Sequence, residues 1–200
     1  METQVYPFTV PQKPPFTEKG NGKIGRKAME LHYKAYFEKS VGELNHVLLS
    51  FPQYQTWTLK QLADNLRMLP EDLAFFAGNV YAHWLYFNGL AEEKPASEKI
   101  QAVFCLNFGS MAEWKARMKR ETAKLYGAGW IFVVADAVGA LKITRTQNND
   151  IPVGSPVLAI DLWEHAYLLE PGLDKEGYLD AVLSAIDWEE AEQRFCNAAR

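Results

Sequence analysis

The chain has 200 residues, 48% of them hydrophobic, which is enough for one sizeable core in a single domain or in two small ones. A formal net charge of −4 gives no sign of a nucleic-acid partner, and no apolar run approaches the ~20 residues that span a bilayer. Residues 1–4 lack the features of a secretory signal and the two cysteines have no CxxC spacing, so we expect a cytoplasmic protein without thiolate-bound zinc or an iron–sulfur cluster.

Helical spacing dominates the first half of the chain. Residues 1–26 are rich in Pro, Gly and Lys and predict an irregular arm. From residue 27 to about residue 50, apolar residues recur at three- and four-residue steps, which predicts a long helix. A short helix is expected over 59–68, and Pro70 suits the first turn of a third helix over 71–88.

The polar segment 91–96 contains a proline and is our candidate linker. It divides the chain into an N-terminal α-helical hairpin domain, residues 1–92, and a C-terminal α/β domain, residues 93–200. The second domain is expected to begin with helices over 97–107 and 110–126. The first of these contains Cys105 in an apolar context, which predicts a buried thiol.

Three runs in the second half predict short strands, namely 130–134, its hairpin partner 140–144, and 156–160. Helices over 177–186 and 188–198 complete the chain. The predicted fold class is therefore α+β, with a helical hairpin domain followed by an α/β domain that carries a small three-stranded antiparallel sheet.

An aspartate and a histidine separated by three residues follow the third expected strand. The strand end would hold the carboxylate of Asp161 rigidly, and the turn after it can bring the imidazole of His165 to the same point. Such a pair can form half of a metal site, although D-x-x-x-H alone arises by chance in many chains.

Two more histidines lie on the apolar faces of the first and third helices. A single histidine in such a place, whether His32 or His83, is more often a hydrogen-bonded core residue than a ligand. Two helices that pack as an antiparallel pair would nevertheless bring both imidazoles together, and three imidazoles with one carboxylate suit Fe, Mn or Zn. His46 lies among polar residues and is expected at the surface.

The string D-L-W-E-H-A-Y at 161–167 resembles the signature of the iron/manganese superoxide dismutases. Other segments are similar to that family in the same order and with compatible spacing: M-E-L-H-Y at 29–33, V-Y-A-H-W-L-Y-F-N at 80–88, N-F-G-S at 107–110 followed by Trp114 and Lys115, G-A-G-W at 127–130, G-Y-L-D-A at 177–181 and D-W-E at 187–189. One departure is Ala82, because the family usually has Asn before its second ligand.

The resemblance implies one iron or manganese ion per subunit, bound by His32, His83, Asp161 and His165, with a water or hydroxide in the fifth position. The ion would cycle between +3 and +2, oxidising one superoxide to oxygen and reducing a second to hydrogen peroxide. Superoxide would be the substrate, with neither nucleic acid nor membrane as a partner.

The resemblance also implies a homodimer, and whether dimers pair into tetramers stays open. Glu164 would reach across the two-fold interface to the ligand His165 of the other subunit. The alternative is that the carboxylate of Glu164 simply faces solvent. Trp130 and Trp163 are expected to be walls of the site, with core packing as their alternative role.

Three outer positions depart from the family pattern. Ser40 stands where the family places a gateway tyrosine, Tyr36 where many members carry a histidine, and Leu168 where a second tyrosine follows E-H-A-Y. We hypothesise that the substrate funnel has been rebuilt, with Tyr36 or an added water doing what the gateway tyrosine does elsewhere.

The group that tunes the metal-bound solvent differs as well. Iron-type members carry a glutamine four residues before the second ligand, and manganese-type members carry it in the loop before the third strand; this chain has Asn79 and Asn149 there. Each is one methylene shorter, so we expect a water to bridge to the solvent ligand. The segment 77–79 is nearer the iron-type form, which favours iron. Lys175 and Lys34 could make the funnel positive or simply be solvated.

Other functions remain open at this point. The altered outer positions favour, as an alternative, a related metal-binding protein with reduced or redirected redox activity. A zinc hydrolase or a non-haem oxygenase is opposed by the third imidazole and by the lack of a separate general base or cosubstrate motif. A binding or structural module without a metal is least favoured, because the presence of four ligand-type residues at the positions of the family's ligands would then be a coincidence.

Overall fold

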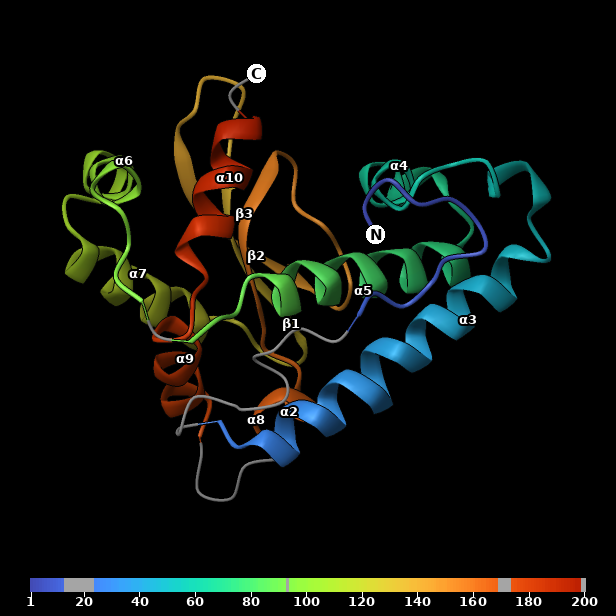
Figure 1. Cartoon of the computed structure of the whole chain (residues 1–200), viewed down its shortest axis with the longest axis horizontal. Coiled ribbons are helices and arrows are strands. Elements are labelled where there is room, and N and C mark those ends of the chain that lie inside the picture. Colours follow the sequence, from blue (N-terminus) through green and yellow to red (C-terminus); the bar gives the residue numbers. More distant parts are fainter. Residues whose placement is uncertain (13–23, 93, 169–173, 199–200) are drawn as a thin grey trace.

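The computed structural model describes residues 1–12, 24–92, 94–168 and 174–198 (Figure 1). A helical first half packs beside a three-stranded antiparallel sheet with its own flanking helices, which confirms the predicted α+β class. No helix in these ranges is long and apolar enough to cross a membrane. The proposed domain boundary at residues 92 and 93 stays a prediction, and much of the expected N-terminal arm, residues 13–23, lies outside the described residues.

The first long helix contains a π-helical stretch that its periodicity did not predict. α2 (Arg26–His32) continues into η1 (Tyr33–Glu38) and then into α3 (Lys39–Leu48) without a break. A π-helical turn rotates the side chains that follow it relative to an ideal α-helix, and such turns occur frequently at functional sites.

The second and third expected helices are both present. α4 (Leu59–Asp64) begins with a capping box and is followed by the 3₁₀ turn η3 (Leu66–Met68), where the sequence predicted one helix over 59–68. α5 (Glu71–Asn88) has the predicted bounds and packs across α3 (Figure 1). Because most of its residues are buried, α5 forms the centre of the helical half.

Helices frame the sheet in the second half: α6 (Glu98–Phe108), α7 (Met111–Ala123), α8 (Glu164–Tyr167), α9 (Lys175–Leu183) and α10 (Trp188–Ala198). The prediction of a buried thiol at Cys105 is wrong, because this residue is exposed. The buried stripe of α6 runs through Ile100, Phe104 and Phe108, and the residue after Phe104 turns away from that stripe.

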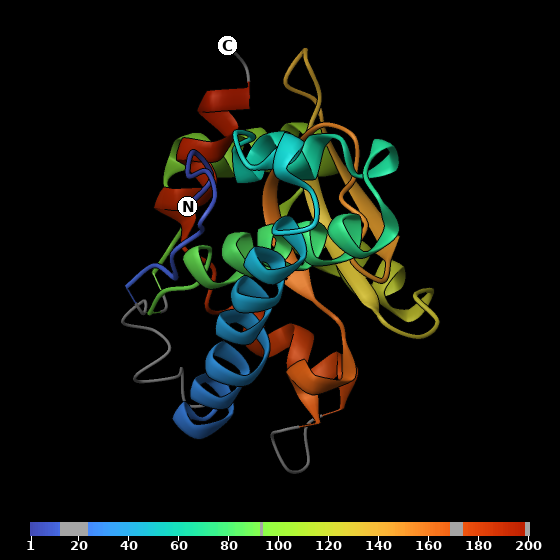
Figure 2. The ribbon, with the colours of Figure 1, turned by 90° about the vertical axis from the view of Figure 1, so that its right-hand side faces the viewer.

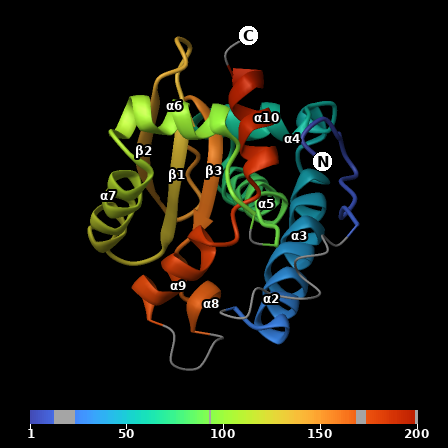
Figure 3. The same cartoon turned by 60° about the vertical axis from the view of Figure 1, so that its left-hand side comes forward.

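The strands follow the order β2-β1-β3, with bounds β1 (Gly129–Ala135), β2 (Leu141–Gln147) and β3 (Ser155–Asp161). β1 is buried throughout, whereas β2 is a partly exposed edge strand. α5 and α10 pack against β3, while α6 and α7 contact β2 (Figure 3). The antiparallel register places Trp130, near the start of β1, opposite Asp161, at the end of β3.

A single cluster of buried apolar side chains joins the two halves, including Phe37 and Leu44 from the helices and Phe132 and Tyr178 from the sheet side. The first residues of the chain are also tied down, because the amide of Asn45 exchanges hydrogen bonds with the backbone of Phe8. Figure 2 shows the helical half packed against the sheet. Side chains that meet between the halves are therefore held from both sides.

Candidate metal centre

Four elements bring four ligand-type side chains to one point between the halves. His32 ends α2, His83 lies within α5, Asp161 ends β3 and His165 lies in α8. Figure 1 shows α2 and α8 side by side, in agreement with their packing contact. One ligand atom from each of the four lies within 4.8 Å of the others. The structure therefore assembles the set that the sequence predicted.

The carboxylate of Asp161 lies at the centre of this cluster. Its Oδ2 is 3.1 Å from Nε2 of His32, 3.1 Å from Nε2 of His165 and 3.4 Å from Nε2 of His83. Its Oδ1 accepts a hydrogen bond from the backbone N–H of Trp163 at 2.8 Å, which fixes the rotation of the carboxylate. One oxygen is thus used by the backbone and the other faces all three imidazoles.

A cation fits this arrangement. Nδ1 of His83 lies 2.9 Å from the carbonyl oxygen of Asn79, which can only accept, so Nδ1 carries the proton and Nε2 presents a lone pair. That Nε2 is buried and makes no hydrogen bond, although it faces the carboxylate. Two hydrogen-bond acceptors that face each other inside a protein without a proton between them are unfavourable. If both atoms were instead bound to one metal ion, with metal–ligand bonds of about 2.0–2.2 Å, they would lie about 3–3.5 Å apart.

Burial and hydrogen bonding together set the protonation of His32, His83 and Asp161 in the way a metal requires. Burial lowers the pKa of His32, and it lowers the pKa of His83 to about 3, with the nearby Asp161 opposing only in part. Burial alone would raise the pKa of Asp161, but hydrogen bonds from His165 and His32 and the nearby His83 outweigh it and hold that pKa below its usual range. Neutral imidazoles and an ionised carboxylate are the forms that bind metal ions.

Aromatic rings enclose the cluster. Trp130 is fully buried and lies edge-on to His83, with ring centroids 5.0 Å apart. Trp163 lies beside His165 at 6.0 Å, and its indole N–H donates to the carbonyl oxygen of Asn148. Both tryptophans therefore lie where the sequence analysis expected the walls.

Tyr36 lies flat against one ligand-type residue. Its ring is nearly parallel to the imidazole of His165, with centroids 3.9 Å apart and 11° between the planes. Ser40, one helical turn further along, is partly exposed, and no hydrogen bond within the described residues joins it to the four clustered side chains. Of these two funnel positions, Tyr36 is the one whose ring stacks on the cluster.

Asn79 and Asn149 meet although 70 residues separate them. The amide nitrogen of Asn79 lies 3.4 Å from Oδ1 of Asn149, and both residues are buried. Oδ1 of Asn79 and Nδ2 of Asn149 have no hydrogen-bond partner in the described structure, so this amide pair retains an unused acceptor and an unused donor. Sequence reasoning singled out each position but did not pair the two.

The two lysines near the expected funnel already have local contacts. Lys34 donates to Glu30 at 2.9 Å, which offsets its charge. The ammonium of Lys175 donates to the carbonyl oxygen of Leu125, and burial lowers its pKa. Glu164 is exposed.

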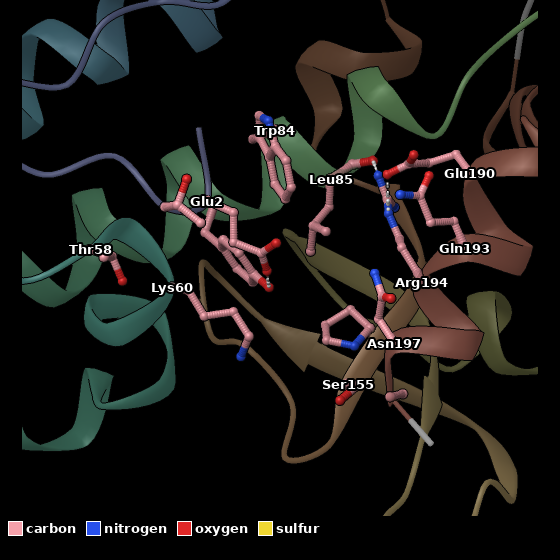
Figure 4. Close-up of a pocket in the computed structure, with 14 residues that line it drawn as sticks. Glu2, Thr58, Lys60, Trp84, Leu85, Ser155, Glu190, Gln193, Arg194 and Asn197 are labelled. Atoms are coloured by element: carbon pink, nitrogen blue, oxygen red, sulfur yellow. Dashed lines mark hydrogen bonds and ion pairs between the residues drawn. The ribbon is translucent and has the colours of Figure 1, made fainter. Parts of the chain in front are cut away.

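A cavity of about 610 Å³ is lined by residues of α5 and α10, among others (Figure 4). Its lining includes Tyr81 and Leu85 of α5, which lie roughly 160° around that helix from His83. Arg194 of α10, on the other wall, donates to Glu190 and to the carbonyl oxygen of Leu85. None of the four clustered residues lines this cavity, so it is separate from the candidate metal centre.

The comparisons with known proteins agree on one family. Residues 96–194 match the profile described as iron/manganese superoxide dismutases, C-terminal domain. The manganese superoxide dismutase of Yersinia enterocolitica is 28% identical over 86% of this chain and 90% of its own length. Those of Escherichia coli (strain K12) and Thermus aquaticus are 27% and 29% identical over 94% and 96% of this chain, covering 97% and 99% of their own lengths.

Proposed function

Because the chain belongs to the iron/manganese superoxide dismutase family, we propose that it is an oxidoreductase that converts superoxide to oxygen and hydrogen peroxide at one iron or manganese ion. The observation that carries the proposal is the buried convergence of His32, His83, Asp161 and His165, in which the lone pair of His83 faces a carboxylate. When bound, the ion would supply the one-electron chemistry that takes two superoxide anions and two protons to one O₂ and one H₂O₂.

The residues of the chain would hold, orient and screen this centre. Asp161 supplies the single anionic ligand, and the pKa values of His32 and His83, lowered by burial, keep both imidazoles unprotonated at neutral pH. The buried ring of Trp130 excludes water on the side of His83. The amides of Asn79 and Asn149 would orient solvent at the centre, since their unused donor and acceptor are buried beside each other.

The metal is proposed as iron or manganese without a choice between them. The segment 77–79 is the one sequence feature that favours iron. The relatives are named as manganese enzymes and therefore do not support that preference. The amide pair of Asn79 and Asn149 combines both family positions and does not discriminate. The three-imidazole, one-carboxylate donor set suits either ion.

A homodimer completes the proposed enzyme. Glu164 is exposed next to His165, and within the described chain no residue hydrogen-bonds to Nδ1 of His165. A carboxylate from a second subunit would supply that missing partner and orient the imidazole.

The test is dismutation by apoprotein reloaded separately with iron and with manganese. High activity with one metal supports the proposal and names the cofactor. Tight metal binding without dismutation in either form would favour the alternative, a related metal-binding protein whose changes at Tyr36, Ser40 and Leu168 have reduced or redirected its redox activity. An Asp161→Asn variant, which lacks the anionic ligand, is the inactive control.

A further inference from the structure

We propose that Tyr36 is a positioning residue that holds the plane of the His165 imidazole by ring stacking rather than through its hydroxyl group. The inference rests on the proposed function, because it assigns a role toward the metal ligand set. It departs from the gateway hypothesis, which would have the phenol hydroxyl join a hydrogen-bond chain to solvent.

His165 is the least enclosed of the four ligand-type side chains. It is 11% exposed, whereas His32 is 1% exposed and His83 and Asp161 are fully buried. It also lies on α8, a helix of only four residues, which is too short to be stable by itself. The orientation of this imidazole therefore depends on contacts from other elements.

The imidazole of His83 has a constraint that the imidazole of His165 lacks. Nδ1 of His83 is held by the carbonyl oxygen of Asn79, in a helix packed on both sides. The Nε2 of His165 faces Asp161, but its Nδ1 has no partner within the described residues. A carboxylate from a second subunit would hold that edge of the ring, yet one hydrogen bond still leaves the ring free to tilt about it.

The stack with Tyr36 removes that freedom. A centroid distance of 3.9 Å with 11° between planes is close face-to-face contact, whereas Trp163 lies further off at 6.0 Å and 28°. Tyr36 also meets His32 edge-on at 6.0 Å, so one ring contacts two of the four clustered residues. Its position in η1, four residues after His32, directs it from the first helix toward α8.

The hydroxyl group of Tyr36 has no role that the structure records. Within the described residues it makes no hydrogen bond, in contrast to Tyr33 and Tyr86, whose hydroxyls bond to Pro11 and Tyr178. The part of Tyr36 that touches the cluster is its ring face. A phenyl ring would preserve that contact, and an aliphatic side chain would remove it.

The experiment compares Tyr36→Phe, Tyr36→Leu and Tyr36→Met in the manganese-loaded full-length protein. Tyr126→Leu is the matched control, because Tyr126 is 83% exposed. The readouts are the rate of manganese release to excess chelator and the ligand-field absorption spectrum, with circular dichroism to confirm folding. Two ring-less variants are included so that one remains if the other does not fold.

We expect Tyr36→Phe to release manganese at the wild-type rate with an unchanged spectrum. Tyr36→Leu and Tyr36→Met should release it roughly 3- to 10-fold faster, the range that one aromatic pair supports, and with a shifted spectrum. Equal acceleration by Phe and Leu would overturn the inference in favour of the hydroxyl, and wild-type behaviour of the folded ring-less variants would overturn it outright. Manganese binding by a wild-type protein that does not dismute superoxide would instead contradict the proposed function while leaving this test valid.

Discussion

The backbone of Gly78 passes so close to Asn149 that a Cβ atom at position 78 would lie 2.0 Å from the carbonyl oxygen of Asn149. This approach brings the loop before β3 against α5 and lets the amides of Asn79 and Asn149 meet. A glycine is required here for space rather than for backbone conformation. The contact links the two parts of the chain that carry the expected solvent-orienting residues.

Gly78→Ala should lower the free energy of unfolding by about 2 kcal/mol, because the rigid carbonyl group must move to admit the methyl group. Urea denaturation would measure the change. Gly42→Ala is the matched control, since no atom lies within 4 Å of a Cβ there and alanine should stabilise the helix by about 1 kcal/mol. Equal stability of the Gly78→Ala variant and the wild type would show that the loop yields freely.

The metal-free protein should lose stability as the pH falls below about 6.5. Burial lowers the pKa of His32 and lowers that of His83 to about 3, so the unfolded chain binds more protons than the folded one in this window. The contribution of each histidine to the free energy of unfolding is fully present above the pKa that it has in the unfolded chain. It is lost by about 1.4 kcal/mol per pH unit as the pH falls from there toward the lower pKa of the folded protein.

Urea midpoints of the apoprotein measured from pH 7.5 to pH 4 would check this dependence. A His83→Gln variant should show a shallower decline, because one of the two titrating groups is gone. A pH-independent midpoint, or a decline as steep in the variant as in the wild type, would contradict the assigned cause.

Glu164→Ala should weaken self-association by at least about tenfold and speed metal release, because the proposed partner of His165 Nδ1 is removed. Sedimentation over a range of protein concentrations would measure the first effect. Glu189→Ala, whose side chain is 86% exposed, is the control for loss of one surface carboxylate. A Glu164→Ala variant that associates as tightly as the control would place the interface elsewhere.

Ser40→Tyr restores the residue type that the family places in the gateway. If the funnel of this chain has been rebuilt to work without a phenol at position 40, adding one should shift the pH profile of dismutation by about 0.5 units or more, or change product inhibition. Ser50→Tyr, an exposed serine beyond α3, controls for an added tyrosine. Kinetics identical to those of the wild type would remove the rebuilt-funnel hypothesis.

Local pattern was sufficient for most elements. Hydrophobic spacing predicted α5 over its observed bounds, and β-branched runs placed all three strands within a few residues. Two local predictions were wrong or incomplete: Cys105 lies beside rather than on the buried stripe of α6, and the π-helical winding of η1 is invisible to a three- and four-residue spacing. Both depend on where each residue falls around the helix axis, which the backbone winding and the packing of the helix set and which hydrophobic spacing alone does not resolve.

The sequence by itself determined the α+β class and the order of the elements, because periodicity is a property of neighbouring residues, and its resemblance to a known family singled out His32, His83, Asp161 and His165 as candidate metal ligands. Only the tertiary structure decided that Tyr36 stacks on His165, that Asn79 meets Asn149 and that the lone pair of His83 is left facing a carboxylate. These contacts join residues 70 or more positions apart, and they form when the packing of a helix on a sheet sets both distance and ring angle.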